Sequence, residues 1–357
     1  MQRAYGLKAL NPARKDAAAK YVKQLYSQSG NSDLIKVLKR ESFKRVYKRM
    51  LLDPESFQPT PRPPDIEPWH GIKPKGPEDF LSSKVIIPSL PQIQFQLQLV
   101  LNDPDSTLAD LTEIISRDPK LVAAVIRLAN SKLFRLKERV DTPAKAVERL
   151  GFDEAGSLAL GTVSLSLFKR AKVYVLDGEK FWKHSIACGV IAQEIARSLK
   201  FADPERFFVG GMLHDIGLYV IFESDFGLAL DLLDLAKFRG KSLYHAELEL
   251  LGFSHAMLGG VVLKDWNFPR SLIVAAAGHH SPSKVKTDPD AMVIHISDFI
   301  ARALGYDLGV SSVLGFFDHN AWDKTGLTGE QLIEMLPAIQ ALINDIFDIL
   351  NTEDYLS

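Results

Sequence analysis

Seven histidine and aspartate residues in the second half of the chain could together bind a metal ion. Imidazole nitrogens and carboxylate oxygens suit borderline divalent metals such as iron, manganese, nickel or zinc. Two pairs of adjacent residues and three single residues make up the set: His184, His214, Asp215, His255, His279, His280 and Asp298. A divalent metal is therefore the cofactor that these residue types suggest.

Two members of the set lie where a polar side chain needs a special explanation. His184 shares a helical stripe with the apolar residues Phe181 and Ile191, so its ring is expected to point into the core. Asp298 lies one turn after Ile294 on another apolar helix face. A carboxylate in such a place costs free energy of folding unless it is paired with a cation or bound to metal.

Each member also has an ordinary structural explanation when it is taken alone. A lone buried histidine is more often a hydrogen-bonded core residue than a ligand, and Asp298 could pair with a lysine. The His279–His280 pair could lie exposed at a helix end. His214 and Asp215, about 100° apart around one expected helix, could reach one ion only from a helix that crosses close to it. The four other histidines are interpreted as structural or exposed: His70, His245, His295 and His319.

Helices must position these residues, because helical periodicity runs from about residue 87 nearly to the end of the chain. Strand-like alternation is nearly absent, so the predicted fold class is all-α. The helices expected to carry the set are 178–200, 204–222, 243–266, 269–279 and 288–305. Further helices are expected at 13–28, 32–52, 141–150, 153–169, 226–238 and 328–351.

A proline-rich segment separates the amino-terminal helices from the rest of the chain. Ten of the 19 prolines lie from Pro54 to Pro91. Proline fixes the backbone angle φ and removes a hydrogen-bond donor, so residues 54–83 are expected to form an extended linker. Residues 1–53 then form a basic helical extension of their own.

Charge is unevenly distributed, although the net charge of the whole chain is −1. The first 50 residues carry a net charge of +10, and the remainder carries −11. The basic helices could contact nucleic acid or an anionic membrane surface. Few aromatic residues accompany the basic ones, so docking of these helices on the acidic remainder of the chain is the favoured interpretation.

The single cysteine and the apolar runs bear on the compartment. Cys188 has no partner for an internal disulfide, which suits a reducing environment. No run approaches the roughly 18 uncharged residues of a membrane helix, and the amino terminus has no apolar signal-peptide core. A cytoplasmic protein without a membrane span is therefore expected.

The motifs around the His/Asp set resemble those of HDOD output domains in bacterial signalling proteins. The amino-terminal half of such a domain resembles LPQIQFQLQLVLNDPDSTLADLTEIISRDPKLVAAVIRLANS, and its following two-helix block resembles TPAKAVERLGFDEAGSLALGT. The similarity is completed by FWKHSIACGVIAQEIA, FVGGMLHDIGLYVI, ELELLGFSHAMLGGVVLKDWNFP and AAAGHHSP. It covers residues 84–303, which leaves residues 304–357 as a carboxy-terminal helical segment.

The resemblance implies roles for the seven residues. HDOD domains are related to HD phosphohydrolases and to HD-GYP phosphodiesterases. The basic HD ligand set matches His184, His214, Asp215 and Asp298. The extra histidines with which HD-GYP-like enzymes build a two-metal centre match His255, His279 and His280. In such a centre Asp215 would bridge two ions, and a bound hydroxide would attack a phosphorus atom.

Two departures from the HD-GYP pattern count against catalysis. The lysine that follows the HDxG motif in those enzymes is replaced by Leu218, and SPSKVKTDPD follows His280 in place of a GYP tripeptide. Lys264, Arg270 or Lys284 could supply the missing charge, although nothing in their spacing places them near the site. A site without this cation could bind metal and still turn over poorly.

The sequence supports three functional hypotheses, in order of preference. The first is a regulatory signal-transduction module of HDOD type that acts through protein partners and retains a divalent metal site. The second is a metal-dependent phosphohydrolase or phosphodiesterase that acts on a nucleotide or cyclic dinucleotide, with Asp215 as catalytic residue. The third, a nucleic-acid or membrane-surface binder that works through the basic extension, is the least favoured.

Overall fold

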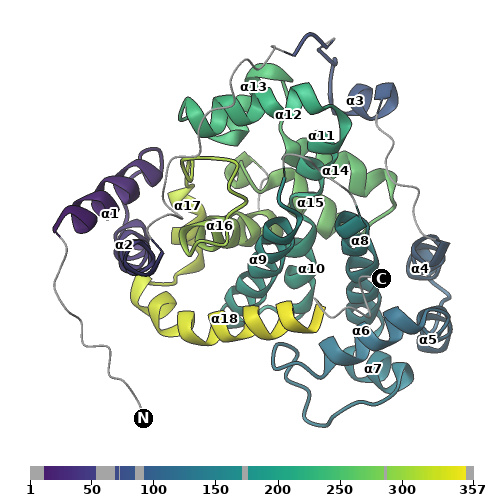
Figure 1. The fold of residues 1–357 in the computed structure, drawn as a ribbon. Coiled ribbons are helices and arrows are strands. Elements are labelled where there is room, and N and C mark those ends of the chain that lie inside the picture. The colour runs from purple at the N-terminus through teal and green to yellow at the C-terminus, as the bar shows by residue number, and fades with distance from the viewer. Residues whose placement is uncertain are drawn as a thin grey trace.

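Helices form all the regular structure in the part of the chain that the computed structural model describes, which is residues 12–53, 69–71, 73–84, 92–170, 176–284 and 288–350. The predicted all-α fold class is confirmed for these residues (Figure 1). In chain order the helices are α1 (Pro12–Leu25), α2 (Asp33–Leu52), α3 (Pro77–Lys84), α4 (Gln92–Asn102), α5 (Leu108–Ser116), α6 (Pro119–Ala129), α7 (Pro143–Leu150), α8 (Phe152–Arg170), α9 (Gly178–Ser198), α10 (Glu205–Leu213), α11 (Ile216–Ser224), α12 (Phe226–Leu233), the π-helical η2 (Asp234–Phe238), α13 (Leu243–Leu250), α14 (His255–Asp265), α15 (Arg270–Gly278), the short 3₁₀ turn η3 (Pro282–Lys284), α16 (Pro289–Ala303), α17 (His319–Thr325) and α18 (Gly329–Leu350).

The helix α9 lies at the centre of the fold and carries His184. Its amino terminus is capped by Asp177, which accepts hydrogen bonds from the backbone N–H groups of Glu179 and Lys180. Residues 184–196 are all buried, because α8, α10, α16 and α18 pack around this helix (Figure 1). A helix that is buried on every side is stable only inside such a core.

Short helices form the first part of the domain. The helices α4, α5, α6 and α7 pack on one another and on α8, on the opposite side of the molecule from α1 and α2 (Figure 1). Since α8 also packs against α10, it joins this group to the central helices.

The basic helices α1 and α2 pack on the rest of the chain, as the favoured interpretation of their charge expected. Leu34 and Leu38 on α2 are fully buried. Tyr26, which follows α1, meets the ring of Phe299 on α16 with centroids 6.2 Å apart. Ser42 Oγ donates a hydrogen bond of 2.7 Å to the carbonyl oxygen at the end of α16. Apolar burial and hydrogen bonds thus fix the extension beside α16.

Two helices that were predicted to be continuous are broken. The expected helix 204–222 is divided into α10 and α11 by a turn at His214 and Asp215. The expected helix 243–266 is divided into α13 and α14, whose axes differ by 78°. Ser254 starts α14 by capping it, because its side chain accepts a hydrogen bond from the backbone N–H of Met257. Apolar residues continue across both breaks, so periodicity did not reveal them.

The predicted extended linker contains a helix. Residues 54–68 and 72 of the predicted linker lie outside the described residues. In the described remainder, α3 begins at Pro77, because proline is well suited to the first turn of a helix. Phe80 on α3 is buried, and its ring contacts Phe253 with centroids 5.7 Å apart. The prediction of an extended connector is therefore wrong for this helix.

The carboxy-terminal segment begins with a loop. Residues 305–318 form this loop between the expected helices 288–305 and 328–351, and α17 and α18 follow it. His319, expected to be structural or exposed, is the first residue of α17, which Asp318 caps by accepting a hydrogen bond from Ala321 N. The loop contains three glycines with positive φ: Gly305, Gly309 and Gly315. A positive φ lies outside the right-handed helical region, so a helix does not continue through these residues.

One stretch of the fold has the length and apolar character of a membrane span. Residues 205–224, across α10 and α11, reach a mean hydropathy of 1.2 but are 89% buried inside the structure. The bent pair α13 and α14 meets the same criterion only if the two helices are counted as one span. Burial in the helical core accounts for this composition.

Candidate metal centre

The seven predicted residues meet at one place inside the helical core. They come from five places in the fold: the central helix α9, the turn between α10 and α11, the start of α14, the end of α15, and α16. In that order they are His184, His214 and Asp215, His255, His279 and His280, and Asp298. All are buried except His280, which is partly buried.

Asp215 lies between two groups of histidines and presents one carboxylate oxygen to each group. Its Oδ2 is 3.4 Å from His184 Nε2 and 3.3 Å from His214 Nε2. Its Oδ1 is 3.1 Å from His255 Nε2 and 3.7 Å from His279 Nε2. This position suits a carboxylate that bridges two ions, one in each group.

Asp298 and His280 complete the two groups. Asp298 Oδ1 is 3.4 Å from His184 Nε2, and its Oδ2 accepts a hydrogen bond of 2.6 Å from Arg302 Nη2. His280 Nε2 lies 2.9 Å from His255 Nε2. Two nitrogen ligands that sit about 2.1 Å from one ion at right angles would be roughly 3 Å apart. The spacing of these two nitrogens therefore suits a shared ion.

Three of the histidines are oriented by backbone carbonyl groups. Each carbonyl oxygen accepts a hydrogen bond, so Nδ1 carries the ring proton and Nε2 keeps its lone pair for a ligand. The three bonds are each 2.7 Å long and join His184 Nδ1 to Tyr306 O, His214 Nδ1 to Gly211 O, and His279 Nδ1 to Ala276 O. The rings are held in the tautomer that metal binding requires.

Glu247 is a site residue that the sequence analysis missed. It is fully buried on α13. Its carboxylate accepts hydrogen bonds from His255 Nδ1 at 2.7 Å and from the His255 backbone N–H at 2.8 Å. It therefore orients His255 as the carbonyl groups orient the other histidines. Its place on the buried stripe with Leu243 and Ala246 was a signal in the sequence, by the argument that identified Asp298.

Carboxylates attract positive charge to this part of the core. Burial works against the charge on Asp215, but His214 and the other facing histidines hold its pKa well below its usual range. Burial also opposes a charge on His255, yet the Glu247 and Asp215 carboxylates outweigh it and raise the pKa of His255 to about 10. Burial, and next the positive charge that a protonated His214 would carry, lower the pKa of His279 to about 3, so the ring of His279 is neutral and can act as a nitrogen ligand.

The residues fit a divalent metal. His214 Nε2 and His279 Nε2 are buried and have no hydrogen-bond partner in the described part of the chain, an arrangement that is costly unless the lone pairs bind an ion. The ligand atoms of His255, His279 and His280 lie within 4.8 Å of one another, and so do those of His214, Asp215 and His279. Such a donor set suits iron, manganese, nickel or zinc.

Neighbouring residues support the centre without belonging to the predicted set. Cys188 Sγ lies 3.5 Å from His184 Nε2, and burial raises the pKa of its thiol well above the usual value. His295 is buried and hydrogen-bonded at both nitrogens, donating to His279 O and accepting from Asp318 N–H. This bonding matches the structural role expected for His295.

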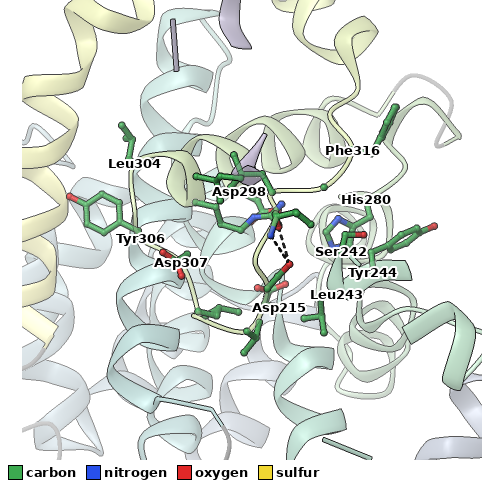
Figure 2. Close-up of a pocket in the computed structure, with 18 of the residues that line it drawn as sticks. Asp215, Ser242, Leu243, Tyr244, His280, Asp298, Leu304, Tyr306, Asp307 and Phe316 are labelled. Carbon is green, nitrogen blue, oxygen red and sulfur yellow. Dashed lines mark hydrogen bonds and ion pairs between the residues drawn. The ribbon is translucent and has the colours of Figure 1, made fainter. Parts of the chain in front are cut away.

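A cavity of about 850 Å³ opens beside the centre, and four of the seven residues line it: Asp215, His255, His280 and Asp298. Figure 2 shows Asp215 and Asp298 in the middle of this space, with His280 and Tyr244 at one side and Tyr306 at the other. Its size is within the range of small-molecule sites. A bound molecule in this cavity would therefore reach the His/Asp centre.

The cations beside the centre differ from those considered in the sequence. Lys284 lines the cavity, whereas Lys264 and Arg270 are not among its lining residues. Arg302 and Arg45 also line it, and the sequence analysis identified neither. The i to i+4 spacing of Arg302 from Asp298 was a usable signal, but the position of Arg45 depends on the packing of α2.

An all-helical fold built around this His/Asp centre is that of the HD superfamily. The chain belongs to the HDOD family, because the family model for the HDOD domain matches residues 87–282, more than half of its length. The matched range ends before Asp298, so this candidate ligand on α16 lies outside it.

Solved structures share this fold. An HDOD domain protein of unknown function from Geobacter sulfurreducens matches with a TM-score of 0.60 at 24% identity, over 77% of this chain and 97% of that one. A "putative phosphohydrolase" from Shewanella amazonensis also has a TM-score of 0.60, at 26% identity over 74% of this chain and 95% of that one. A second protein of that organism, named a "putative metal-dependent phosphohydrolase", has a TM-score of 0.56 at 18% identity, over 77% and 96%.

One curated relative is an uncharacterized protein of Treponema pallidum. It is 24% identical over 268 residues, which are 71% of this chain and 50% of the relative. This chain therefore spans about half the length of the curated relative that it matches.

Proposed function

We propose that this chain is a cytoplasmic signal-transduction protein whose HDOD domain holds two divalent metal ions bridged by Asp215. The observation that carries the proposal is the division of the Asp215 carboxylate, with Oδ2 facing His184 and His214 and Oδ1 facing His255 and His279. The ions stabilise the core where these helices meet, and the domain acts through protein partners.

A regulatory role is supported by the composition of the cavity wall. Leu218 lines the cavity at the position where HD-GYP enzymes, by the resemblance, carry a lysine. An apolar side chain there cannot hold a phosphate or stabilise its developing charge. Metal binding alone does not need this lysine. The centre can therefore hold metal stably even if it hydrolyses phosphate esters slowly.

The metal content of two ligand variants tests the centre. We expect about two ions per wild-type chain purified without chelator, by analogy with two-metal sites. Asp215→Ala should lose both ions because both groups share this carboxylate, whereas His280→Ala should lose only the ion of its own group. The exposed His70 supplies a matched control, and His70→Ala should retain the wild-type content. Substoichiometric metal in the wild type, or full metal in Asp215→Ala, would contradict the assignment.

A second candidate function is a metal-dependent phosphohydrolase that acts on a nucleotide or cyclic dinucleotide. The cavity favours it, because Asp215 and Asp298 line a space large enough for such a molecule. Bound metal would polarise the phosphoryl group and supply hydroxide near neutral pH. Asp215 would position the ions, and Arg302 would hold Asp298 in place through the 2.6 Å hydrogen bond.

Hydrolysis of an activated phosphodiester tests this candidate. Bis(p-nitrophenyl) phosphate should be cleaved by metal-loaded wild type and by His70→Ala but not by Asp215→Ala. Equal release of p-nitrophenol by wild type and Asp215→Ala would assign the activity to a contaminant and remove the candidate.

A further inference from the structure

The cavity beside the metal centre has a second wall that comes from outside the HDOD domain. Arg45 and Val46 of α2 line it, and so do Tyr21 and Leu25 of α1. These residues belong to the basic amino-terminal extension, which precedes the matched range 87–282. The extension therefore forms one wall of the space beside the metal centre, and a ligand there would contact both parts of the chain.

Arg45 is held in this wall by two features of the end of α16. Its Nη2 donates a hydrogen bond of 2.8 Å to the carbonyl oxygen of Ala303, the last residue of α16. Gly305, at φ +87°, allows the guanidinium to lie against the backbone, because a Cβ at this position would overlap Arg45 Nη1. The guanidinium is thus fixed at the helix end that carries Asp298 and Arg302.

The bond to Ala303 leaves most of the Arg45 donors unused. A guanidinium has five N–H donors, and Arg45 Nε is buried with no partner among the described residues. In the same part of the chain no carboxylate oxygen lies within 4 Å of this guanidinium; Asp307 acts on it only through its electrostatic field. Burial lowers the pKa of Arg45, which reflects the cost of this charge without a close counterion.

Arg302 contributes a second guanidinium with spare donors. Its Nη2 is bonded to Asp298, and its Nε is buried without a partner in the described residues. If metal ions neutralise Asp215 and Asp298, the four cationic side chains that line the cavity outnumber its two remaining carboxylates, Asp307 and Asp318; the cations are Arg45, Arg49, Lys284 and Arg302. Planar guanidinium groups bind phosphate through paired hydrogen bonds.

We propose that Arg45 and Arg302 bind the phosphate of a small organic phosphate ligand in this cavity, so that the amino-terminal extension completes the ligand site of the HDOD domain. The proposal rests on the proposed metal centre for the charge balance of the cavity, whereas the Arg45 contact itself does not depend on it. A cavity of about 850 Å³ accommodates a molecule of nucleotide size. The rings of Tyr21, Tyr244 and Tyr306 also line it and offer surfaces on which a flat organic group can stack.

Calorimetric titration of the full-length protein with inorganic phosphate tests the role of Arg45. Arg45→Ala should raise the Kd for phosphate by at least about tenfold, because a lost charge-assisted hydrogen bond has roughly that effect. Arg45→Lys should keep part of the affinity, since it keeps the charge. Arg40→Ala is the matched control, because Arg40 lies on the same helix, is exposed and is not a lining residue. It should bind phosphate as the wild type does.

Metal content and unfolding temperature, measured on the same samples, separate the outcomes. If Arg45 only caps α16, Arg45→Ala lowers the unfolding temperature but binds phosphate as Arg40→Ala does, and the proposal is wrong. Wild type that carries metal but binds no phosphate at millimolar concentration also overturns it, without affecting the proposed centre. If the wild type contains no metal, the proposed metal centre is wrong. Phosphate binding that still depends on Arg45 would then support the proposed phosphate site by itself. Metal-free protein that binds no phosphate contradicts both.

Discussion

The carboxylates at this site are explained by what each of their oxygens contacts. Asp215 divides its two oxygens between two groups of histidines, and Asp298 divides its own between His184 and Arg302. Glu247 gives both of its oxygens to His255. A buried carboxylate without such contacts would destabilise the fold, so these three carboxylates and their partners must be retained together.

Substitution of Glu247 should weaken metal binding without touching a ligand atom. In Glu247→Gln one of the two oxygens that lie 2.7 Å from His255 Nδ1 becomes an NH₂ group, which opposes this N–H, and the negative charge beside His255 is lost. Loss of such an orienting contact typically costs about 10–100-fold in metal affinity. Glu249→Gln on the same helix is the control, because Glu249 is exposed. Competition with a chromogenic chelator measures both affinities, and equal values would show that Glu247 has no orienting role.

Residue types and spacing were enough to predict which histidines and aspartates the structure brings together. All seven meet in the core, since their order and spacing matched those of a known family. Glu247 could have been added from its buried helical stripe. Arg45 could not, because its place beside the cavity depends on α2 packing against α16, a contact between residues 258 positions apart in sequence. Whether the set binds metal remains a prediction.

At the scale of helices, the breaks determine the geometry of the centre. The turn at His214 and Asp215 ends α10 and lets these adjacent side chains face the same centre, with His214 Nε2 3.3 Å from Asp215 Oδ2; neighbours about 100° apart on a straight helix converge less easily. The 78° bend between α13 and α14 brings Glu247 within hydrogen-bond distance of His255, eight residues later. Periodicity predicted where helices exist but not these breaks, because the apolar core continues on both sides of each.

The crossing of α11 and α14 gives a prediction at this scale. Gly217 follows the His–Asp turn, and a Cβ there would overlap the His255 carbonyl oxygen and lie 2.5 Å from Gly259 N. These are backbone atoms, which cannot move aside as a flexible side chain can. Gly217→Ala should therefore push α11 and α14 apart. We expect a loss of about 1–3 kcal/mol in the free energy of unfolding, as for other overpacked cores, together with reduced metal content.

Gly178→Ala is the control for this substitution. A Cβ at Gly178, at the start of α9, meets no atom within 4 Å, so this variant should unfold at the wild-type denaturant concentration or slightly above it. Chemical denaturation of both variants measures the difference. Equal midpoints would mean that the close approach of α11 and α14 is not required.

At the scale of the whole molecule, the centre joins helices that are far apart in the sequence. Its residues come from α9, the α10–α11 turn, α14, the end of α15 and α16, and the extension packs on the end of α16. A ligand that binds only the folded state adds its binding free energy to the stability of the fold. Metal bound at this junction should therefore stabilise the whole domain in one cooperative transition.

Removal of metal tests this coupling. Chelation should lower the unfolding temperature of the wild type by roughly 5–15 °C, because an ion present at about 1,000 times its Kd contributes around 4 kcal/mol. Added metal should restore the original value. Asp215→Ala, which lacks the shared carboxylate, should unfold at the same temperature with and without chelator. Differential scanning fluorimetry at matched ionic strength measures both proteins. If chelation shifts both proteins equally, the stabilising ion is bound elsewhere, and if it shifts neither, the seven residues form a polar core that does not need metal.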